Sequence, residues 1–430
     1  MRLSGINRRR FLGTSAMSGA AAAAAPLRPR SAGAGDNEVV KIGLLLPLTG
    51  DVAAWGLPGL YGCQMWAQHQ NAAGGVEIGS ATYDIEIVSV DDQYRRDQAG
   101  IGAYRLIHEE GVQFIGMLGG DTWAGAQPMI DDAGMLASTL IPTDLSPDTV
   151  NLVAPCEVHP IYNLTGVWWL ADTMTQASSA AICAQSDAIG RPSMATYLAA
   201  FEVAGIAVDE AIYFDAVTTD FAPVVAAMLA GDPDILCFDT AYPDFVNELC
   251  RQAYLQGFDG QIISCTADHY QDIIANTSEA FMEGTVFQFP DFDDPAMNDP
   301  RINFRDPNRF YADYVARYPG QWGAVSWEYA SILDLWVHGA RKAGSIKPQD
   351  VLAGMKEGGK APHAFGEASW WGRELFGIDN ALVGNWPVVQ IQNGKAVITD
   401  FRNIPEWWDL HSETLIRNLE DQGEMWYQRD

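Results

Sequence analysis

The sequence is short of basic residues, with 26 Lys and Arg against 55 Asp and Glu in a chain of 430 residues. Six of the basic residues are arginines within the first 35 residues, a stretch with no acidic residue, so the rest of the chain keeps 20 basic and all 55 acidic side chains. A surface of that charge repels phosphate backbones and anionic lipid headgroups. We therefore expect neither nucleic acid nor a membrane surface as a partner.

Catalytic and metal-binding motifs are also missing. No HExxH, CxxC, GxSxG or GxGxxG pattern occurs, and the seven histidines lack the spacing of metal ligands. The Asp91-Asp92 pair fits a strand end followed by a solvated turn better than a pair of catalytic carboxylates. The sequence therefore predicts no metal site, no cofactor and no enzymatic activity.

The six cysteines form no compact framework along the chain. Cys183, Cys237 and Cys265 fall inside apolar runs that are typical of strands. We expect buried thiols that pack as small hydrophobic groups.

Long hydrophobic runs are absent except at the N-terminus. Arg8-Arg9-Arg10-Phe11-Leu12 leads into an alanine-rich stretch that ends at Ala25, which is the pattern of a twin-arginine export signal over residues 1–35. A membrane-spanning or ordinary N-terminal helix is the alternative. The apolar run from 11 to 25 is 15 residues long, whereas a bilayer span needs about 20. We therefore expect a periplasmic protein without direct membrane insertion.

Strand-like and helix-like runs alternate in two successive blocks, which is typical of right-handed βαβ crossovers and doubly wound sheets. The expected strands are 39–46, 85–90, 114–118 and 136–140 in the first block, then 180–184, 210–214, 235–238 and 262–265 in the second. Roughly 395 exported residues exceed what one core usually holds. The sequence thus predicts an α/β fold of two doubly wound, Rossmann-like lobes.

The last third of the chain is expected to start no third sheet. A helix should open at Pro58 in the first block, and an apolar helical stripe runs from Val325 to Ala340. Residues 386–391 and 395–399 flank Asn393-Gly394 and predict a β-hairpin. Residues 406–430 form a tryptophan-rich acidic tail, which we expect to be a surface helix.

Loops at the carboxyl ends of the predicted strands are the candidate site, because open α/β sheets bind ligands there. Glycine-rich turns at helix N-termini present N–H groups to carboxylate or carbonyl oxygens, and aromatic rings supply apolar walls. Six polar or glycine-rich loops occupy such places: 47–56, 119–125, 141–147, 186–191, 239–242 and 266–270.

These segments resemble the type I periplasmic solute-binding proteins of ABC transporters, in the branched-chain amino acid, amide and urea class. The likeness begins with Lys41-Ile42-Gly43-Leu44, Pro47-Leu48-Thr49-Gly50 and Trp55-Gly56, and it covers the exported chain. The resemblance implies a Venus-flytrap whose lobes, joined by a three-strand hinge, close on a ligand. Its parts would be lobe 1 at 36–157 plus about 290–384, lobe 2 at 158–289 plus about 385–405, and a C-terminal tail at 406–430.

The resemblance also implies roles for individual residues. The first lobe would grip the ligand's carboxylate or amide oxygen, and the second would receive its ammonium on Asp268. Aspartates in these loops favour a ligand with a positive or hydrogen-donating group, and Leu145 and Ile189 depart from the residues found in leucine-type relatives. The implied ligand-binding residues are Trp55, Asp121, Thr122, Trp123, Thr143, Asp144, Leu145, Ile189, Arg191, Tyr242 and Asp268.

The function implied is capture of a small polar ligand, amino-acid-like or amide-like, by a monomer that delivers it to the membrane permease of an ABC transporter. A ligand-sensing subunit of a receptor would use the same fold and pocket. An exported hydrolase is a further alternative, in which Asp268 would act with His269.

Overall fold

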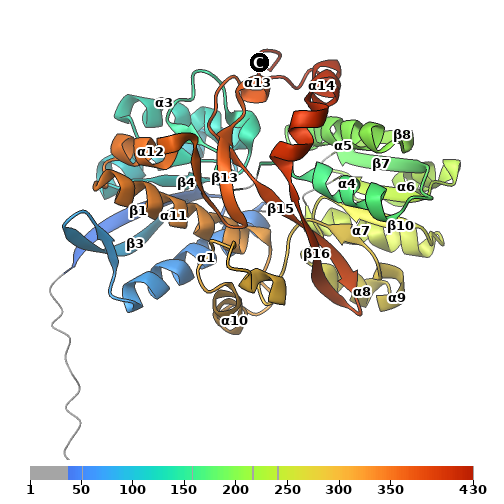
Figure 1. Ribbon diagram of the computed structural model, residues 1–430, viewed down its shortest axis with the longest axis horizontal. Coiled ribbons are helices and arrows are strands. Elements are labelled where there is room, and N and C mark those ends of the chain that lie inside the picture. The colour runs from blue at the N-terminus through green and yellow to red at the C-terminus, as the bar shows by residue number, and fades with distance from the viewer. Residues whose placement is uncertain (1–36, 51, 157, 216, 240–241, 430) are drawn as a thin grey trace, which may run out of the picture. The chain divides into compact units, whose positions relative to one another are not determined.

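The computed structural model describes residues 37–429 apart from 51, 157, 216, 240 and 241. The proposed export signal at 1–35 lies outside the described residues. Asn37–Asp430 forms one compact unit. It contains two large sheets, each flanked by helices (Figure 1).

The first large sheet has six strands in the order β2-β3-β1-β4-β5-β6. The central strand β1 runs parallel to both β3 and β4 and is largely buried, as its continuous apolar run predicts. The predicted strands of the first block are confirmed with shifted ends. The strands are β1 Glu38–Leu46, β2 Val76–Ile78, β3 Ala81–Asp91, β4 Ile115–Met117, β5 Ala137–Ser138 and β6 Leu152–Val153, and the helices are α1 Ala53–Ala72, α2 Arg96–Tyr104 and α3 Trp123–Ala133.

The second large sheet has seven strands in the order β16-β15-β11-β10-β9-β7-β8. Its five earlier strands are parallel, and the predicted strands of the second block are confirmed. The strands are β7 Ser179–Gln185, β8 Ala207–Phe214, β9 Ile235–Asp239, β10 Gln261–Ser264 and β11 Val286–Phe287. The helices are α4 Asn163–Thr173, α5 Gly190–Ala204, α6 Ala222–Met228, α7 Pro243–Leu255, α8 Tyr270–Asn276 and α9 Glu279–Met282.

The last third returns to both sheets. Helices α10 Pro307–Arg317 and α11 Ala324–Ala343 pack on α1 beside the first sheet, and α12 Pro348–Lys356 packs on α11. The hairpin of β15 Asn385–Gln392 and β16 Lys395–Asn403 joins the second sheet through antiparallel pairing of β15 with β11. Its turn has φ of 52° at Asn393 and 71° at Gly394, the left-handed pair that a tight hairpin needs.

Two expectations were wrong. A third sheet does exist, formed by three short antiparallel strands. Tertiary contacts order these segments, whose sequences show little alternation of their own. The strands are β12 Lys360–His363, β13 Gly366–Trp371 and β14 Ala381–Val383, and α13 Arg373–Phe376 lies between the last two. Helix α1 begins at Ala53 and encloses Pro58. Close packing against α11 fixes the position of α1, since a Cβ added at Gly62 would lie 1.8 Å from the Ser326 carbonyl oxygen.

The acidic tail is helical, as predicted. Helix α14 Ile404–Gln422 begins where the Asn403 side chain accepts a hydrogen bond from the Glu406 N–H at 3.1 Å. One face of α14 is buried against α5 through Leu415 and Leu419, so the helix is part of the fold and only its other face is exposed.

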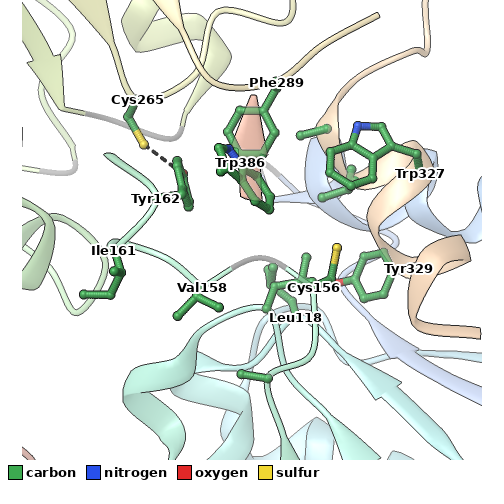
Figure 2. Packing of buried hydrophobic residues seen from close by; sticks show 14 of the residues in the cluster. Leu118, Cys156, Val158, Ile161, Tyr162, Cys265, Phe289, Trp327, Tyr329 and Trp386 are labelled. Carbon is green, nitrogen blue, oxygen red and sulfur yellow. Dashed lines mark hydrogen bonds between the residues drawn. The ribbon is translucent and has the colours of Figure 1, made fainter. Parts of the chain in front are cut away.

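The chain passes three times between the two lobes: after β6, after β11, and from β14, which is bridged to the end of the first sheet at Ala154, to β15. Aromatic residues from all three passages pack together (Figure 2). The Tyr162 ring stacks on Trp386 with centroids 5.1 Å apart and meets the edge of Phe289 at 5.2 Å. The ring centroid of Trp327, from α11, lies 6.0 Å from that of Trp386. This aromatic cluster makes the junction of the two lobes a continuous buried core. All six cysteines are buried, as expected.

Candidate functional site

A pocket lies between the two lobes, and we call it the inner pocket. Its walls come from loops and strand ends of the first sheet, from the passages between the sheets and from loops of the second sheet. The lining residues are Val52, Trp55, Tyr94, Leu118, Leu140, Ile141, His159, Tyr162, Ile189, Tyr242, Thr266 and Phe289. The two sheets thus share one site at their facing rims, as the topology of open α/β sheets favours.

The inner pocket is small, and the part of its lining that the structure describes is uncharged. About 510 Å³ of space lies among its side chains, but only about 40 Å³ admits water-sized molecules. No described side chain that lines it is an Asp, Glu, Lys or Arg. Its polar groups are tyrosine and threonine hydroxyls and one imidazole. Such a lining suits a ligand with an apolar body and a few neutral hydrogen-bonding contacts.

The imidazole of His159 is neutral. Its Nε2 lies 3.1 Å from the Ile189 carbonyl oxygen, which can only accept, so Nε2 carries the proton. Its Nδ1 then accepts from the Tyr162 hydroxyl at 3.3 Å, and that hydroxyl lies 3.2 Å from the Cys265 Sγ (Figure 2). Burial lowers the pKa of His159 to about 4. His159 therefore adds no charge to the pocket at neutral pH.

Tyr94 reaches the pocket from a strained turn after β3. Both Gln93 and Tyr94 have φ of 53°, a left-handed conformation that is rare for such side chains. Two carboxylates hold the turn: Asp91 accepts from the Gln93 N–H at 2.9 Å and Asp92 from the Tyr94 N–H at 2.8 Å. Each left-handed residue costs about 1–3 kcal/mol, so these bonds keep Tyr94 in place.

Asp91 and Asp92 differ in their hydrogen-bond partners and in their burial. Asp91 also accepts from the Leu48 N–H at 2.8 Å and the Thr49 hydroxyl at 2.6 Å, so it ties the loop after β1 to the loop after β3. Asp92 is fully buried, and burial raises its pKa to about 6. The expectation of a solvated turn is wrong for Asp92, because its side chain is buried and accepts a hydrogen bond from the backbone of its own turn.

A second hollow, the outer cleft, adjoins the inner pocket at Tyr94, which lines both. It has a volume of about 1370 Å³ and takes residues from both lobes and from the C-terminal segment. In contrast to the inner pocket it is charged. Its charged lining residues are Arg95, Arg96, Asp97, Asp121, Asp144, Asp148, Asp187, Arg191, Glu424 and Arg429.

Asp144 is hydrogen-bonded to neighbouring residues of the first lobe. Its carboxylate accepts from the Gly120 N–H at 3.0 Å and from the Thr139 hydroxyl at 2.7 Å. Burial raises the pKa of Asp144 to about 7, although these hydrogen bonds and the nearby Arg429 guanidinium oppose that rise. Its geometry therefore supports the loop after β4.

The structure divides the residues that the sequence proposes for the site into three groups. Those in the inner pocket are Trp55, Ile189 and Tyr242. Those in the outer cleft are Asp121, Trp123, Thr143, Asp144, Leu145 and Arg191. Those outside both linings are Thr122 and Asp268.

The last group is bonded within the fold. Thr122 is fully buried, and its hydroxyl donates to the Gly119 carbonyl at 3.0 Å. Asp268 accepts from the Ala324 N–H at 2.8 Å, at the first residue of α11. A carboxylate at a helix N-terminus satisfies an unpaired N–H and meets the positive end of the helix dipole. Asp268, from the second sheet, thereby caps a helix that packs beside the first.

Sequence reasoning missed most of the inner pocket. Tyr94 follows strand β3, so the rule that ligands bind at the carboxyl ends of strands could have found it. Thr266 lay inside a proposed loop but was not singled out. His159, Tyr162 and Phe289 lie on the passages between the sheets, where no local pattern marks them.

This architecture matches that of a known protein family. The model described as "Periplasmic binding protein" matches residues 39–396. The chain belongs to this family. No curated protein matches this periplasmic binding protein in sequence.

Solved structures share its fold at low identity. A leucine binding protein from Thermotoga maritima is 17% identical with a TM-score of 0.68, over 85% of this chain and 99% of that one. A solute binding protein of an ABC transporter from R. palustris, in complex with 4-hydroxybenzoate, is 17% identical with a TM-score of 0.66, over 87% and 100%. A branched-chain amino acid binding protein from Streptococcus pneumoniae, in complex with isoleucine, is 15% identical with a TM-score of 0.65, over 85% and 99%.

Family and neighbours agree with the predicted fold of two α/β lobes. The family match makes the chain a periplasmic binding protein, with its place in the periplasm or outside the cell. Within the described part of the chain, no helix is long and apolar enough to cross a membrane.

Proposed function

We propose that this protein captures a small molecule with an aromatic or apolar body in the inner pocket and delivers it to an ABC permease. The observation that carries this proposal is the aromatic lining contributed by both lobes, which is uncharged over the residues that the structure describes. Trp55, Tyr242 and Phe289 offer flat apolar surface, and tyrosine hydroxyls offer neutral polar contact for a phenol or carboxyl group.

The lining argues against a free amino acid as the first candidate. An ammonium group removed from water needs a carboxylate close by. No described residue lining the inner pocket supplies one, and Asp268 is bonded to α11. Neighbours of the same fold were solved with 4-hydroxybenzoate, 3,4-dihydroxybenzoic acid and benzoate. Their ligands illustrate the size and chemistry that we expect.

Ligand entry requires the lobes to separate. The 40 Å³ open to small molecules holds about one or two waters, which is far less than a benzoate needs. The aromatic cluster at the three passages gives a packed pivot about which the lobes can open and close. Binding then stabilises the closed arrangement.

We also propose export of residues from about 36 onward by the twin-arginine route, action as a monomer and the lobe boundaries given from the sequence. The Arg8-Arg9-Arg10-Phe11-Leu12 pattern and the following apolar run support the route. Membership of β15 and β16 in the second sheet supports assignment of 385–405 to lobe 2, and the packing of α11 on α1 supports return of the chain to lobe 1 before that.

An amino-acid-like ligand is the second candidate. The neighbours described as leucine and isoleucine binders favour it. So does the exposed carboxylate of Asp121 in the outer cleft, which an ammonium group protruding from the inner pocket could meet. In that case the ligand would span both hollows.

Calorimetry with benzoate, 4-hydroxybenzoate, leucine and isoleucine separates the two candidates. We expect one of the aromatic acids to bind and both amino acids to give no heat. Binding of leucine or isoleucine alone would replace the first candidate with the second, and silence of all four would contradict both.

A further inference from the structure

The C-terminal segment that follows α14 runs from one lobe to the other. Its starting point is fixed on lobe 2, where the Arg417 guanidinium pairs with the Glu202 carboxylate of α5 and Gln422 accepts from the Tyr213 hydroxyl of β8 at 3.4 Å. In Figure 1, α14 lies beside α5 and the chain ends near α13. We call residues 423–429 the C-terminal strap.

The far end of the strap is bonded to the other side of the outer cleft. The Arg429 guanidinium donates to the Thr143 carbonyl through Nη1 and to the Leu375 carbonyl through Nη2, the latter at 3.3 Å. Thr143 belongs to the loop after the first sheet's β5, and Leu375 lies in α13, whose flanking sheet is bridged to Ala154 of the first lobe. One side chain thus joins the strap to two segments that belong with lobe 1.

The strap also forms part of the wall of the outer cleft. Gly423, Glu424, Trp426 and Arg429 line that cleft together with Asp144 and Asp187. Met425 is the one described residue of the strap that is buried, so little apolar area resists its release. A segment anchored firmly at one end and by a few polar bonds at the other is easily detached at that second end.

From this arrangement we propose that the C-terminal strap is a latch between the lobes. Arg429 holds the outer cleft closed, and separation of the lobes requires its two hydrogen bonds to break. The latch shifts the balance between open and closed forms in the unliganded protein. It rests on the two-lobe fold and needs no assumption about the ligand.

Spin labels on the two lobes can measure this balance. Ile101 of α2 and Leu255 of α7 are 64% and 60% exposed, and the six native cysteines are buried, so Ile101→Cys and Leu255→Cys provide selective labelling sites. The distance between the labels is measured by pulsed electron paramagnetic resonance without added ligand. We expect Arg429→Ala to raise the ratio of open to closed molecules about tenfold, as loss of about 1.4 kcal/mol would do.

Tyr427→Ala is the matched control. Tyr427 lies in the same strap, is 53% exposed and bonds to Glu420 of α14. We expect its distance distribution to match that of the parent protein. Arg429→Lys keeps the charge but cannot reach two carbonyls with a planar fork, so it should lie between the parent and Arg429→Ala.

An unchanged distribution in Arg429→Ala overturns the latch. If that variant does not fold, as near-ultraviolet circular dichroism would reveal, Arg429→Lys and a chain ending at Gln422 decide the question by the same measurement. A chain ending at Gln422 that stays as closed as the parent also overturns the proposal.

Discussion

The inner pocket and the outer cleft share Tyr94 and a wall of loops, but they differ in charge and in origin. The inner pocket has no charged lining residue among those described, and the outer cleft has carboxylates and guanidinium groups from both lobes and the strap. Desolvated aromatic contact gives affinity, whereas solvated charge mainly affects encounter and orientation. The comparison teaches that most of the residues proposed from the sequence line the outer cleft, while the surface that we propose for ligand recognition is the inner pocket.

The largest expected difference between the two regions is in stability. Trp386 is 2% exposed and packs behind the inner pocket against Tyr162 and Phe289, whereas Trp426 lines the outer cleft and is half-buried. Trp386→Ala should lower the free energy of unfolding by about 3–5 kcal/mol, and Trp426→Ala by about 1 kcal/mol or less. Urea unfolding measures both, and equal losses would show that the two regions are packed alike.

Ligand affinity should show the next largest difference. Trp55→Ala and Tyr242→Ala each remove an aromatic wall of the inner pocket. Each should weaken binding at least about tenfold, or ~1.4 kcal/mol. Calorimetry with 4-hydroxybenzoate as the probe measures this, with Tyr427→Ala as a control at a residue that lines neither the inner pocket nor the outer cleft. Full affinity in both variants would mean that the ligand binds elsewhere.

The free energy of unfolding should depend on pH in opposite directions through Asp144 of the outer cleft and His159 of the inner pocket. The raised pKa of Asp144, about 7 against 3.8, means that the folded protein keeps a proton that the unfolded chain releases, so rising pH removes stability between these values. The lowered pKa of His159, about 4 against 6.5, removes stability as pH falls through that window. One such group changes the free energy of unfolding by up to about 1.4 kcal/mol per pH unit.

Asp144→Asn tests the outer-cleft half of this prediction. Its stability, measured by urea unfolding from pH 5 to pH 8, should decline less with rising pH than that of the parent protein. If the free energies of unfolding of the variant and the parent protein changed in parallel from pH 5 to pH 8, Asp144 would be ionised throughout that range.

The smallest effect is expected at Asp121. Its side chain is exposed in the outer cleft, and surface charges in water contribute little to affinity. Asp121→Asn should change the dissociation constant for 4-hydroxybenzoate by less than about twofold. A tenfold loss would extend the recognition surface into the outer cleft and favour an amino-acid-like ligand.

Local patterns made much of the fold predictable. The apolar run of β1, the Asn393-Gly394 turn and the prolines at the starts of α6 and α7 act over a few residues, so their elements could be assigned from sequence. The sheet of β12, β13 and β14 could not, because its short strands depend on contacts with distant segments.

The site was predictable only in outline. Loops at strand ends pointed to Trp55 and Tyr242, which line the inner pocket, but the loops alone could not distinguish the inner pocket from the outer cleft. Asp268 shows the limit: a carboxylate in a polar loop suits an ammonium or a helix N-terminus equally well until the partner is known. The structure supplies that partner as the Ala324 N–H.

By itself the sequence determined the alternation of strands and helices, the doubled architecture and the set of loops at the rims, since these follow from periodicity and turn chemistry along the chain. Tertiary structure alone decided which rim residues meet in the inner pocket, how the three passages pack their aromatic rings together and which segments Arg429 of the C-terminal strap contacts. Those arrangements join residues far apart in the sequence, from 54 positions between Leu375 and Arg429 to 286 positions between Thr143 and Arg429, and no local preference encodes such pairings.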